Sequence, residues 1–190
     1  MRFSGVEGTR GACRPIVTPA DEMISDGRLA WAVVIPAYDE AARLPAYLRQ
    51  VLAFFEQRGD PFEILVVDDG SRDSTAERVR EFQRSTDRVR LISLPENRGK
   101  GYAVRTGMVN ASGAFRLFTD ADGATPITEV SRLEAAVQAG ADIAVGSRVL
   151  EDPSVVIQTR WHRKAAGQCF NWIVRVLGVS AVADTQCGFK

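Results

Sequence analysis

The sequence predicts an α/β fold with a mainly parallel central sheet and helices on both faces. Short apolar runs alternate with segments in which apolar residues recur at helical spacing. The runs are apolar at almost every position, as in parallel strands buried on both faces. Polar clusters follow the runs, as at the carboxyl edge of such a sheet, where ligands bind.

Length and composition limit the function classes. The chain has 190 residues, of which 45% are hydrophobic, so one domain with a sizeable core is expected. Lys plus Arg total 24 and Asp plus Glu total 24, a balance that does not favour nucleic acid as a partner. Cys13, Cys169, Cys187 and His162 form neither a disulfide framework nor a zinc pattern, which favours reduced thiols in the cytoplasm.

The first 30 residues contain no periodic segment. Residues 1–29 are rich in Gly, Pro, Thr and charge, so we expect a disordered or loosely attached leader, followed by one domain over 30–190. The leader lacks the apolar core of a signal peptide, and no apolar run in the sequence reaches the roughly 18–20 residues of a membrane span.

The first two predicted strands are 30–35, which stops at Pro36, and 63–67. Between them, apolar residues at helical spacing predict a helix over 44–55 that ends at Gly59 and Pro61. After the second strand, Ser74 and Glu77 form the pattern of a capping box, which predicts that a helix starts there and runs through Phe82.

Three more strands are predicted at 89–94, 115–118 and 142–146, with helices at 102–110 and 128–139 between them. We expect the strand at 142–146 to join the same parallel sheet. A last long helix is predicted over 161–177, where Trp161 and Trp172 lie at positions that suit either the core or a lipid interface.

Two carboxylates end the fourth strand, in Asp120-Ala121-Asp122-Gly123. Oxygen donors of this kind suit Mg²⁺ or Mn²⁺, and a metal held by two carboxylates keeps positions open for water and nucleotide phosphates. The alternative is a surface turn, because Asp and Gly are also favourable turn residues.

Each of the five predicted strands is followed by polar or glycine residues. In strand order these are Tyr38 and Glu40, Asp68 and Asp69, Gly99-Lys100-Gly101, Asp120 and Asp122, and Arg148. A parallel sheet brings such endings to one crevice, so a nucleotide-phosphate site with a metal is the preferred interpretation. A dinucleotide fingerprint and a P-loop are both excluded, because the glycines that they require are missing.

The ordered motifs resemble family 2 inverting glycosyltransferases, which have the GT-A fold, a Rossmann-like sandwich. The motifs are Val34-Ile35-Pro36-Ala37-Tyr38-Asp39-Glu40, residues 67–75, Asn97-Arg98-Gly99-Lys100-Gly101, Asp120-Ala121-Asp122 and Gly146-Ser147-Arg148. Residues 184–190 are similar to the dolichyl-phosphate β-glucosyltransferase branch. Related enzymes continue past this stretch with a helix and a strand that close the acceptor side, so we expect the C-terminal part of the domain to be missing.

The resemblance implies roles for individual residues. Pro36, Ala37, Tyr38 and Glu40 would line the nucleoside pocket, together with Asp68, Asp69, Gly99, Lys100, Asp120 and Ala121. Asp69 would accept a hydrogen bond from the base, and Lys100 would lie near the base or the phosphates. Asp120 and Asp122 would hold the metal, and Asp122, Arg148 and Arg163 would be the catalytic residues.

The implied reaction moves glucose from UDP-glucose to dolichyl or another polyprenyl phosphate, at the cytoplasmic surface of a membrane. Such an acceptor needs no general base, because a phosphate with a second pKa near roughly 6 is already anionic at neutral pH. Arg148 and Arg163 would position it, although Arg163 equally suits a solvated helix face. The alternatives are mannose transfer from GDP-mannose, or a truncated nucleotide-sugar-binding domain without activity. The sequence indicates no oligomeric state.

Overall fold

The computed structural model describes residues 3–5, 29–146 and 188–189. They fall into two compact units, which are considered separately. The first contains residues 29–130 and Phe189, and the second contains residues 3–5, 131–146 and Gly188. The helix predicted at 161–177, and the leader apart from residues 3–5 and 29, lie outside the described residues.

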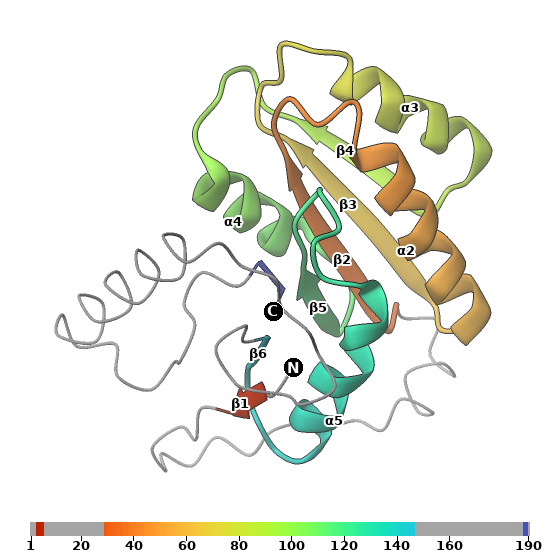
Figure 1. The fold of residues 1–190 in the computed structure, drawn as a ribbon, viewed down its shortest axis with the longest axis vertical. Helices are drawn as coiled ribbons and strands as arrows, with labels where there is room; N and C mark the ends of the chain where they lie inside the picture. Colours follow the sequence, from red (N-terminus) through yellow and green to blue (C-terminus); the bar gives the residue numbers. More distant parts are fainter. Residues whose placement is uncertain (1–2, 6–28, 147–187, 190) are drawn as a thin grey trace, which may run out of the picture. The chain divides into compact units, whose positions relative to one another are not determined.

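The first unit contains a four-stranded parallel sheet (Figure 1). Its strands are β2 (Trp31–Ala37), β3 (Phe62–Asp68), β4 (Val89–Ser93) and β5 (Phe115–Phe118), in the order β4-β3-β2-β5. Ala37 pairs with Asp68, and Val34 pairs with Phe118. The carboxyl ends of the strands therefore meet at one edge, as the sequence predicts.

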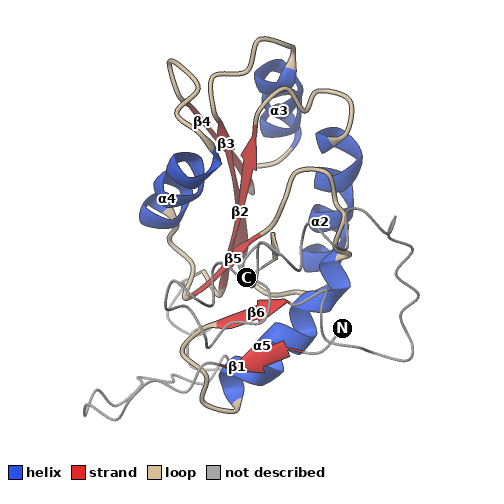
Figure 2. Cartoon of the chain, turned by 60° about the vertical axis from the view of Figure 1, so that its left-hand side comes forward, coloured by secondary structure: helices blue, strands red, loops and turns tan. Residues whose placement is uncertain are grey.

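Helices cover both faces of this sheet. Helices α2 (Leu44–Arg58) and α3 (Thr75–Ser85) lie on one side, and α4 (Lys100–Asn110) lies on the other (Figure 2). Helix α2 ends at Gly59, whose left-handed backbone lets its N–H bond to the carbonyls of Phe55 and Glu56. The layered α/β architecture predicted from the alternating pattern is confirmed.

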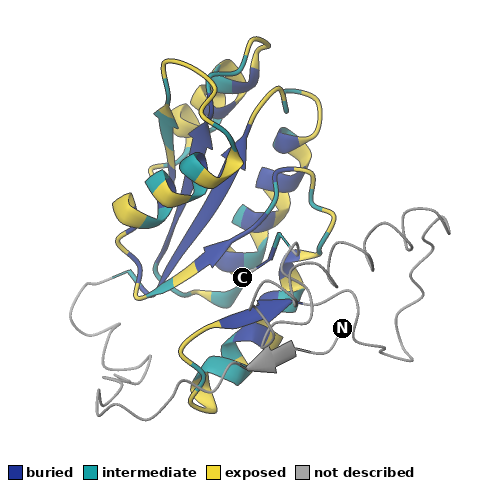
Figure 3. Ribbon diagram, turned by 90° about the vertical axis from the view of Figure 1, so that its left-hand side faces the viewer, coloured by how far each residue is buried: buried dark blue, intermediate teal, exposed yellow. Residues whose placement is uncertain are grey.

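The core of the first unit lies on the two faces of the sheet. Every residue of β2 and β3 is buried (Figure 3). On the α2 side, Trp31 packs against Phe55 and Phe115, with ring centroids 5.7 and 5.0 Å away. On the α4 side, Ala32, Val34 and Leu65 form a cluster with Ala111. Burial on both faces explains why these strands are apolar throughout rather than alternating.

The predicted capping box at the start of α3 is wrong. Ser74 does occupy the N-cap position, but its side chain makes no cap hydrogen bond. Glu77 is instead 3.2 Å from the guanidinium of Arg80. The N–H of Thr75, the first residue of the helix, donates to Asp73 Oδ1 at 2.9 Å, so an aspartate before the cap satisfies one of the first helical N–H groups. The bond to the Ser74 side chain that a capping box requires does not form.

The fifth predicted strand pairs differently from the prediction. Strand β6 (Ala144–Gly146) is antiparallel to β1 (Phe3–Gly5), in a two-stranded sheet of the second unit. A strand of three residues is too short for its hydrophobic pattern to specify which strand it pairs with. Its partner β1 was also not predicted, because it lies within the expected leader. The short 3-10 helix η1 (Ile127–Glu129) leads directly into α5 (Val130–Gln138). Among the described residues, no helix has the length and apolar character needed to cross a membrane.

Candidate functional site

A cavity of about 400 Å³ lies at the carboxyl edge of the parallel sheet, within the first unit. It is lined by Pro36, Ala37, Tyr38, Glu40, Asp69, Asn97, Gly99, Lys100, Ala103, Asp120, Ala121 and Asp122. These residues follow β2, β3, β4 and β5 in turn. The structure therefore brings together the clusters predicted to converge, apart from Arg148, which with Arg163 lies outside the described residues.

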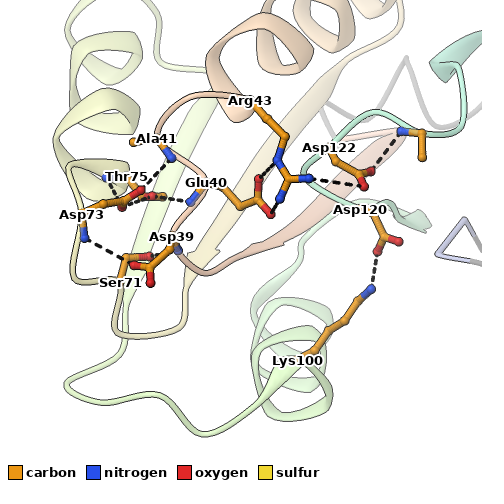
Figure 4. Close-up of polar contacts among 11 residues, drawn as sticks. Asp39, Glu40, Ala41, Arg43, Ser71, Asp73, Thr75, Lys100, Asp120 and Asp122 are labelled. Carbon is orange, nitrogen blue, oxygen red and sulfur yellow. Dashed lines mark hydrogen bonds and ion pairs between the residues drawn. The ribbon is translucent and has the colours of Figure 1, made fainter.

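The loop after β2 is fixed by the loop after β3 (Figure 4). Asp39 has a left-handed backbone with φ of 52°. Its Oδ1 accepts hydrogen bonds from the N–H groups of Arg72 and Asp73, at 2.8 and 3.3 Å. In return, Asp73 Oδ2 accepts from the N–H of Ala41 at 3.0 Å. These reciprocal bonds, here called the Asp39–Asp73 clasp, set the path of the chain on which Tyr38 and Glu40 enter the cavity.

The clasp also affects the acidity of Asp73. Partial burial by itself would raise the pKa of its carboxyl group, but hydrogen bonds from Thr75 and Ala41 outweigh burial and lower the pKa below the ordinary 3.8. Thr75 is fully buried, and its hydroxyl accepts a hydrogen bond from the N–H of Glu40 at 2.9 Å. The start of α3 thus supports the loop that carries Glu40.

The two adjacent aspartates at the end of β3 have different roles. Asp69 lines the cavity, and its two carboxylate oxygens accept hydrogen bonds from the N–H groups of Arg98 and Gly99, at 2.9 and 2.8 Å. Asp68 does not line the cavity; its Oδ1 accepts from the N–H of Ser71 at 3.1 Å and shapes the turn. Both are almost fully buried. The predicted pair of site residues therefore divides into one lining residue and one turn residue.

Gly70 allows these loops to approach each other. Its φ is +70°, and a Cβ atom at this position would lie 2.5 Å from the backbone carbonyl carbon of Glu96. A side chain here would therefore push away the loop that leads to Gly99 and Lys100.

The turn after β5 places Asp120 and Asp122 against α2. Asp122 Oδ1 accepts a hydrogen bond from the N–H of Ala124 at 3.0 Å, which closes the turn. Thr119, which precedes the turn, also pairs with Phe189 in a single antiparallel bridge. Tyr47 of α2 contacts the Thr119 hydroxyl, and burial raises the pKa of Tyr47 to about 12, with a further contribution from the nearby Asp120 and Asp122. Tyr47 is therefore a neutral phenol at the base of the site.

Cations accompany the acidic residues of the cavity. Lys100, the first residue of α4, places its Nζ 2.6 Å from Asp120 Oδ1 (Figure 4). Arg43 Nε donates to Glu40 Oε2 at 2.7 Å, and its Nη1 lies 4.0 Å from Asp122 Oδ2. Each carboxylate of the Asp-Ala-Asp turn therefore faces a positive group.

The donor set fits a divalent cation. Asp120 Oδ1 is buried, and among the described residues only the ammonium of Lys100, 2.6 Å away, balances its charge. Among the described residues, Asp122 Oδ2 has only the distant Arg43 contact of 4.0 Å, and the side chain is 38% exposed. Two oxygen donors of hard character fit Mg²⁺ or Mn²⁺ when phosphate and water supply the remaining ligands. No group of three or more His, Cys, Asp or Glu side chains suited to a metal occurs in the described part of the chain.

Three residues that contribute to the site were not predicted. Asn97 lines the cavity, and its Oδ1 accepts a hydrogen bond from the N–H of Gly99 at 3.2 Å. Ala103 lines the cavity from the first turn of α4. Arg43 pairs with Glu40, and the spacing of three residues between opposite charges at the start of a helix was the signal that could have identified it.

Comparisons with known proteins extend this picture. Residues 32–176 match the family described as "Glycosyl transferase family 2". The "Dolichyl-phosphate beta-glucosyltransferase" of Drosophila melanogaster is 39% identical over 175 residues, which cover 85% of this chain and 54% of that protein. The protein of the same name from Homo sapiens is 37% identical over 172 residues, covering 84% and 53%. The chain thus spans about half the length of these relatives.

A solved structure is also similar. It is "Mannosyltransferase PcManGT from Pyrobaculum calidifontis in complex with GDP-Man and Mn2+", with a TM-score of 0.50 and 28% sequence identity. The match covers 57% of this chain and 32% of that one.

Proposed function

Because the chain belongs to glycosyl transferase family 2, as its motifs predict, we propose that it is a metal-dependent inverting glycosyltransferase that uses a nucleotide-sugar donor. In this proposal it moves glucose from UDP-glucose to dolichyl or another polyprenyl phosphate. The observation that carries the proposal is the convergence of Asp69, Lys100, Asp120 and Asp122 on one cavity.

The donor nucleotide would bind along the carboxyl ends of β2 and β3. Pro36, Ala37 and Tyr38 offer a flat, partly apolar wall, while Asp69 offers carboxylate oxygens at the base of the cavity. Both of these oxygens already accept backbone N–H groups, but each carboxylate oxygen has a further lone pair for a donor on a base. The choice of uracil rests on the relatives, whose names specify glucosyl transfer.

Asp120 and Asp122 would hold the Mg²⁺ or Mn²⁺ ion. Bound there, such an ion acts as a Lewis acid on the diphosphate and stabilises the charge that develops on the leaving nucleotide. Lys100, at the start of α4, would contribute a second positive charge. The neighbouring structure that contains GDP-Man and Mn²⁺ supports both the metal and the class of donor.

The acceptor would be an anionic lipid phosphate at the cytoplasmic face of a membrane. Its phosphate oxygen is already a nucleophile at neutral pH, so no general base is needed. Arg148 and Arg163 are proposed to position this phosphate through charge-assisted hydrogen bonds. Both residues lie outside the described part of the chain, so their role rests on the resemblance of the motifs.

Isothermal titration calorimetry with UDP, GDP and UDP-glucose tests the donor, in the presence and absence of Mn²⁺. We expect binding of UDP and UDP-glucose to be stronger than that of GDP and to depend on Mn²⁺. A clear preference for GDP would instead support the second candidate, mannose transfer from GDP-mannose, which the Pyrobaculum neighbour favours. The absence of metal-dependent nucleotide binding would contradict both.

The acceptor is tested by transfer of radiolabelled sugar from the donor to short polyprenyl phosphates. We expect label in the lipid phosphate, and transfer only to a soluble sugar hydroxyl would refute this part of the proposal. If nucleotide binds in a metal-dependent manner but no acceptor is labelled, the chain is a nucleotide-sugar-binding domain without activity, the remaining alternative.

A further inference from the structure

The cations beside Asp120 and Asp122 are held in different ways. Arg43 is fixed by its two contacts with Glu40, and it approaches Asp122 no closer than 4.0 Å. Lys100 is about as exposed as Arg43, with 57% of its side chain accessible against 60%, but it makes a single ion pair among the described residues. Its ammonium lies 2.6 Å from Asp120 Oδ1 and 5.6 Å from the centre of the Phe118 ring. Lys100 is therefore the cation that has both the freedom and the position to change partner.

Lys100 occupies one of the two carboxylate oxygens that Asp120 could offer a metal. Asp120 Oδ1 is buried, and its charge is balanced by the ammonium alone among the described groups. Two cations cannot share this oxygen at contact distance without strong repulsion. The ion pair must therefore open before a metal binds to Asp120 Oδ1.

A nucleotide diphosphate offers Lys100 a new partner in the same cavity. Lys100 lines this cavity beside Asp120, and lysine carries a compact charge on a flexible four-carbon chain that can bind phosphate as a point charge. We propose that Lys100 is an exchangeable counter-cation, which pairs with Asp120 in the free protein and moves to the diphosphate when metal and nucleotide bind. This inference rests on the proposed function, and it concerns the energetic coupling of the two ligands.

The exchange makes metal and nucleotide binding mutually dependent. A metal that binds alone must break the Lys100–Asp120 pair and leave the ammonium without a partner. When nucleotide is also present, the pair is broken once, Asp120 gains the metal as its partner and Lys100 gains the diphosphate. By linkage, each ligand must then increase the affinity for the other by the same factor.

Lys100→Gln separates this exchange from an ordinary phosphate contact. The variant keeps a polar side chain of similar length but leaves Asp120 free for the metal. Without nucleotide, the affinity for Mn²⁺ should rise by about two- to fivefold, the range expected for loss of a partly exposed ion pair. A lysine that served only to bind phosphate would not produce this rise.

The experiment measures Mn²⁺ binding to the full chain by electron paramagnetic resonance, with and without saturating UDP. For the unaltered protein we expect UDP to tighten Mn²⁺ binding by at least about fivefold, the lower end of typical coupling between two sites. In Lys100→Gln this factor should fall. Arg80→Gln is the control, since it removes one ion-paired, half-exposed arginine on α3 and should leave both affinities unchanged.

The outcomes separate this inference from the proposed function. If the unaltered protein binds Mn²⁺ and UDP with strong coupling but Lys100→Gln behaves identically, the exchange is wrong and the proposed function stands. If the unaltered protein shows no coupling between Mn²⁺ and UDP, the proposed metal-dependent donor site fails, and the exchange fails with it.

Discussion

The hydroxyl groups of Tyr47 and Thr119 lie 2.6 Å apart, both buried, and join helix α2 to the residue that precedes Asp120. The two residues are 72 positions apart in sequence, so this bond ties the strand end before the Asp120-Ala121-Asp122 turn to the helical layer that contains α2. Its strength can be measured directly.

Removal of the Tyr47 hydroxyl should destabilise the fold. Tyr47→Phe leaves Thr119 Oγ1 buried without this partner, which typically costs about 1–3 kcal/mol of unfolding free energy. Urea denaturation measures the loss. The double variant Tyr47→Phe with Thr119→Val should cost less than the sum of the single variants, because neither partner is then left unpaired. Strictly additive losses would show that the bond contributes nothing.

The Asp39–Asp73 clasp should make stability depend on acidic pH. Because the pKa of Asp73 is lower in the folded protein, its carboxylate adds stability above the ordinary pKa of an aspartate. This contribution is lost as the pH falls through the lowered value. The thermal stability of Asp73→Asn should therefore differ from that of the parent chain at pH 7, and the difference should shrink as the pH falls below about 4. A difference that is constant with pH would contradict the clasp.

Asp69 should be needed for nucleotide binding through the loop that it holds. Asp69→Asn replaces one carboxylate oxygen with an amide nitrogen that cannot accept a hydrogen bond, so the bond from either Arg98 or Gly99 is lost. Loss of a hydrogen bond to a charged group costs about 1.5–3 kcal/mol, so UDP affinity should fall roughly tenfold or more. Calorimetry measures it, with the exposed Asp87→Asn as a charge-matched control. Equal UDP affinity in both variants would remove Asp69 from the site.

The sheet and the position of the site were predictable because strong local patterns specify them. The runs that became β2 and β3 are apolar at nearly every residue and end in Pro36 or in Asp68-Asp69-Gly70. Parallel strands then leave their polar endings at one edge by geometry alone. The convergence of Tyr38, Asp69, Lys100 and Asp122 followed from this arrangement.

Pairings that depend on tertiary contacts could not be predicted. Periodicity places a strand at Ala144–Gly146 but does not specify that β1 pairs with it. Ser74 and Glu77 have the spacing of a capping box, but the Ser74 side chain makes no cap hydrogen bond, and Asp73 instead accepts from the N–H of Thr75. The sequence also could not distinguish the roles of Asp68 and Asp69. They are the same residue type at adjacent positions, and only the folded turn determines which of them lines the cavity.

The close approach of Gly113 to β2 should be essential for stability. A Cβ atom at Gly113 would lie 2.3 Å from the backbone nitrogen of Ala32, which cannot move without shifting the strand. Gly113→Ala should therefore cost about 1–3 kcal/mol or more, as overpacking of a core does. The control is Gly101→Ala in α4, where nothing lies within 4 Å of the added atom. Urea denaturation should show a loss for Gly113→Ala and none for Gly101→Ala; equal stabilities would contradict the close packing.

Asp122 should contribute to metal binding but not to folding. In Asp122→Asn the side-chain oxygen can still accept the N–H of Ala124, so the turn after β5 keeps its hydrogen bond while the charge is removed. The thermal stability should therefore stay close to that of the parent chain. Mutation of a residue that only hydrogen-bonds to a metal ligand typically lowers metal affinity by about 10–100-fold. Loss of the charge of a ligand itself should therefore weaken Mn²⁺ binding at least about tenfold.

Electron paramagnetic resonance of Mn²⁺ in the presence of UDP measures this loss, with Asp87→Asn as the control, because its side chain is 95% exposed. A variant that folds normally but loses Mn²⁺ shows that Asp122 is a ligand. If Asp122 served only the turn, Asp122→Asn would keep both its stability and its Mn²⁺ affinity. If Asp122→Asn binds Mn²⁺ as the control does, then Asp122 is a turn residue and the metal must be held by other groups. That result would favour the alternative of a surface turn at Asp120-Ala121-Asp122-Gly123.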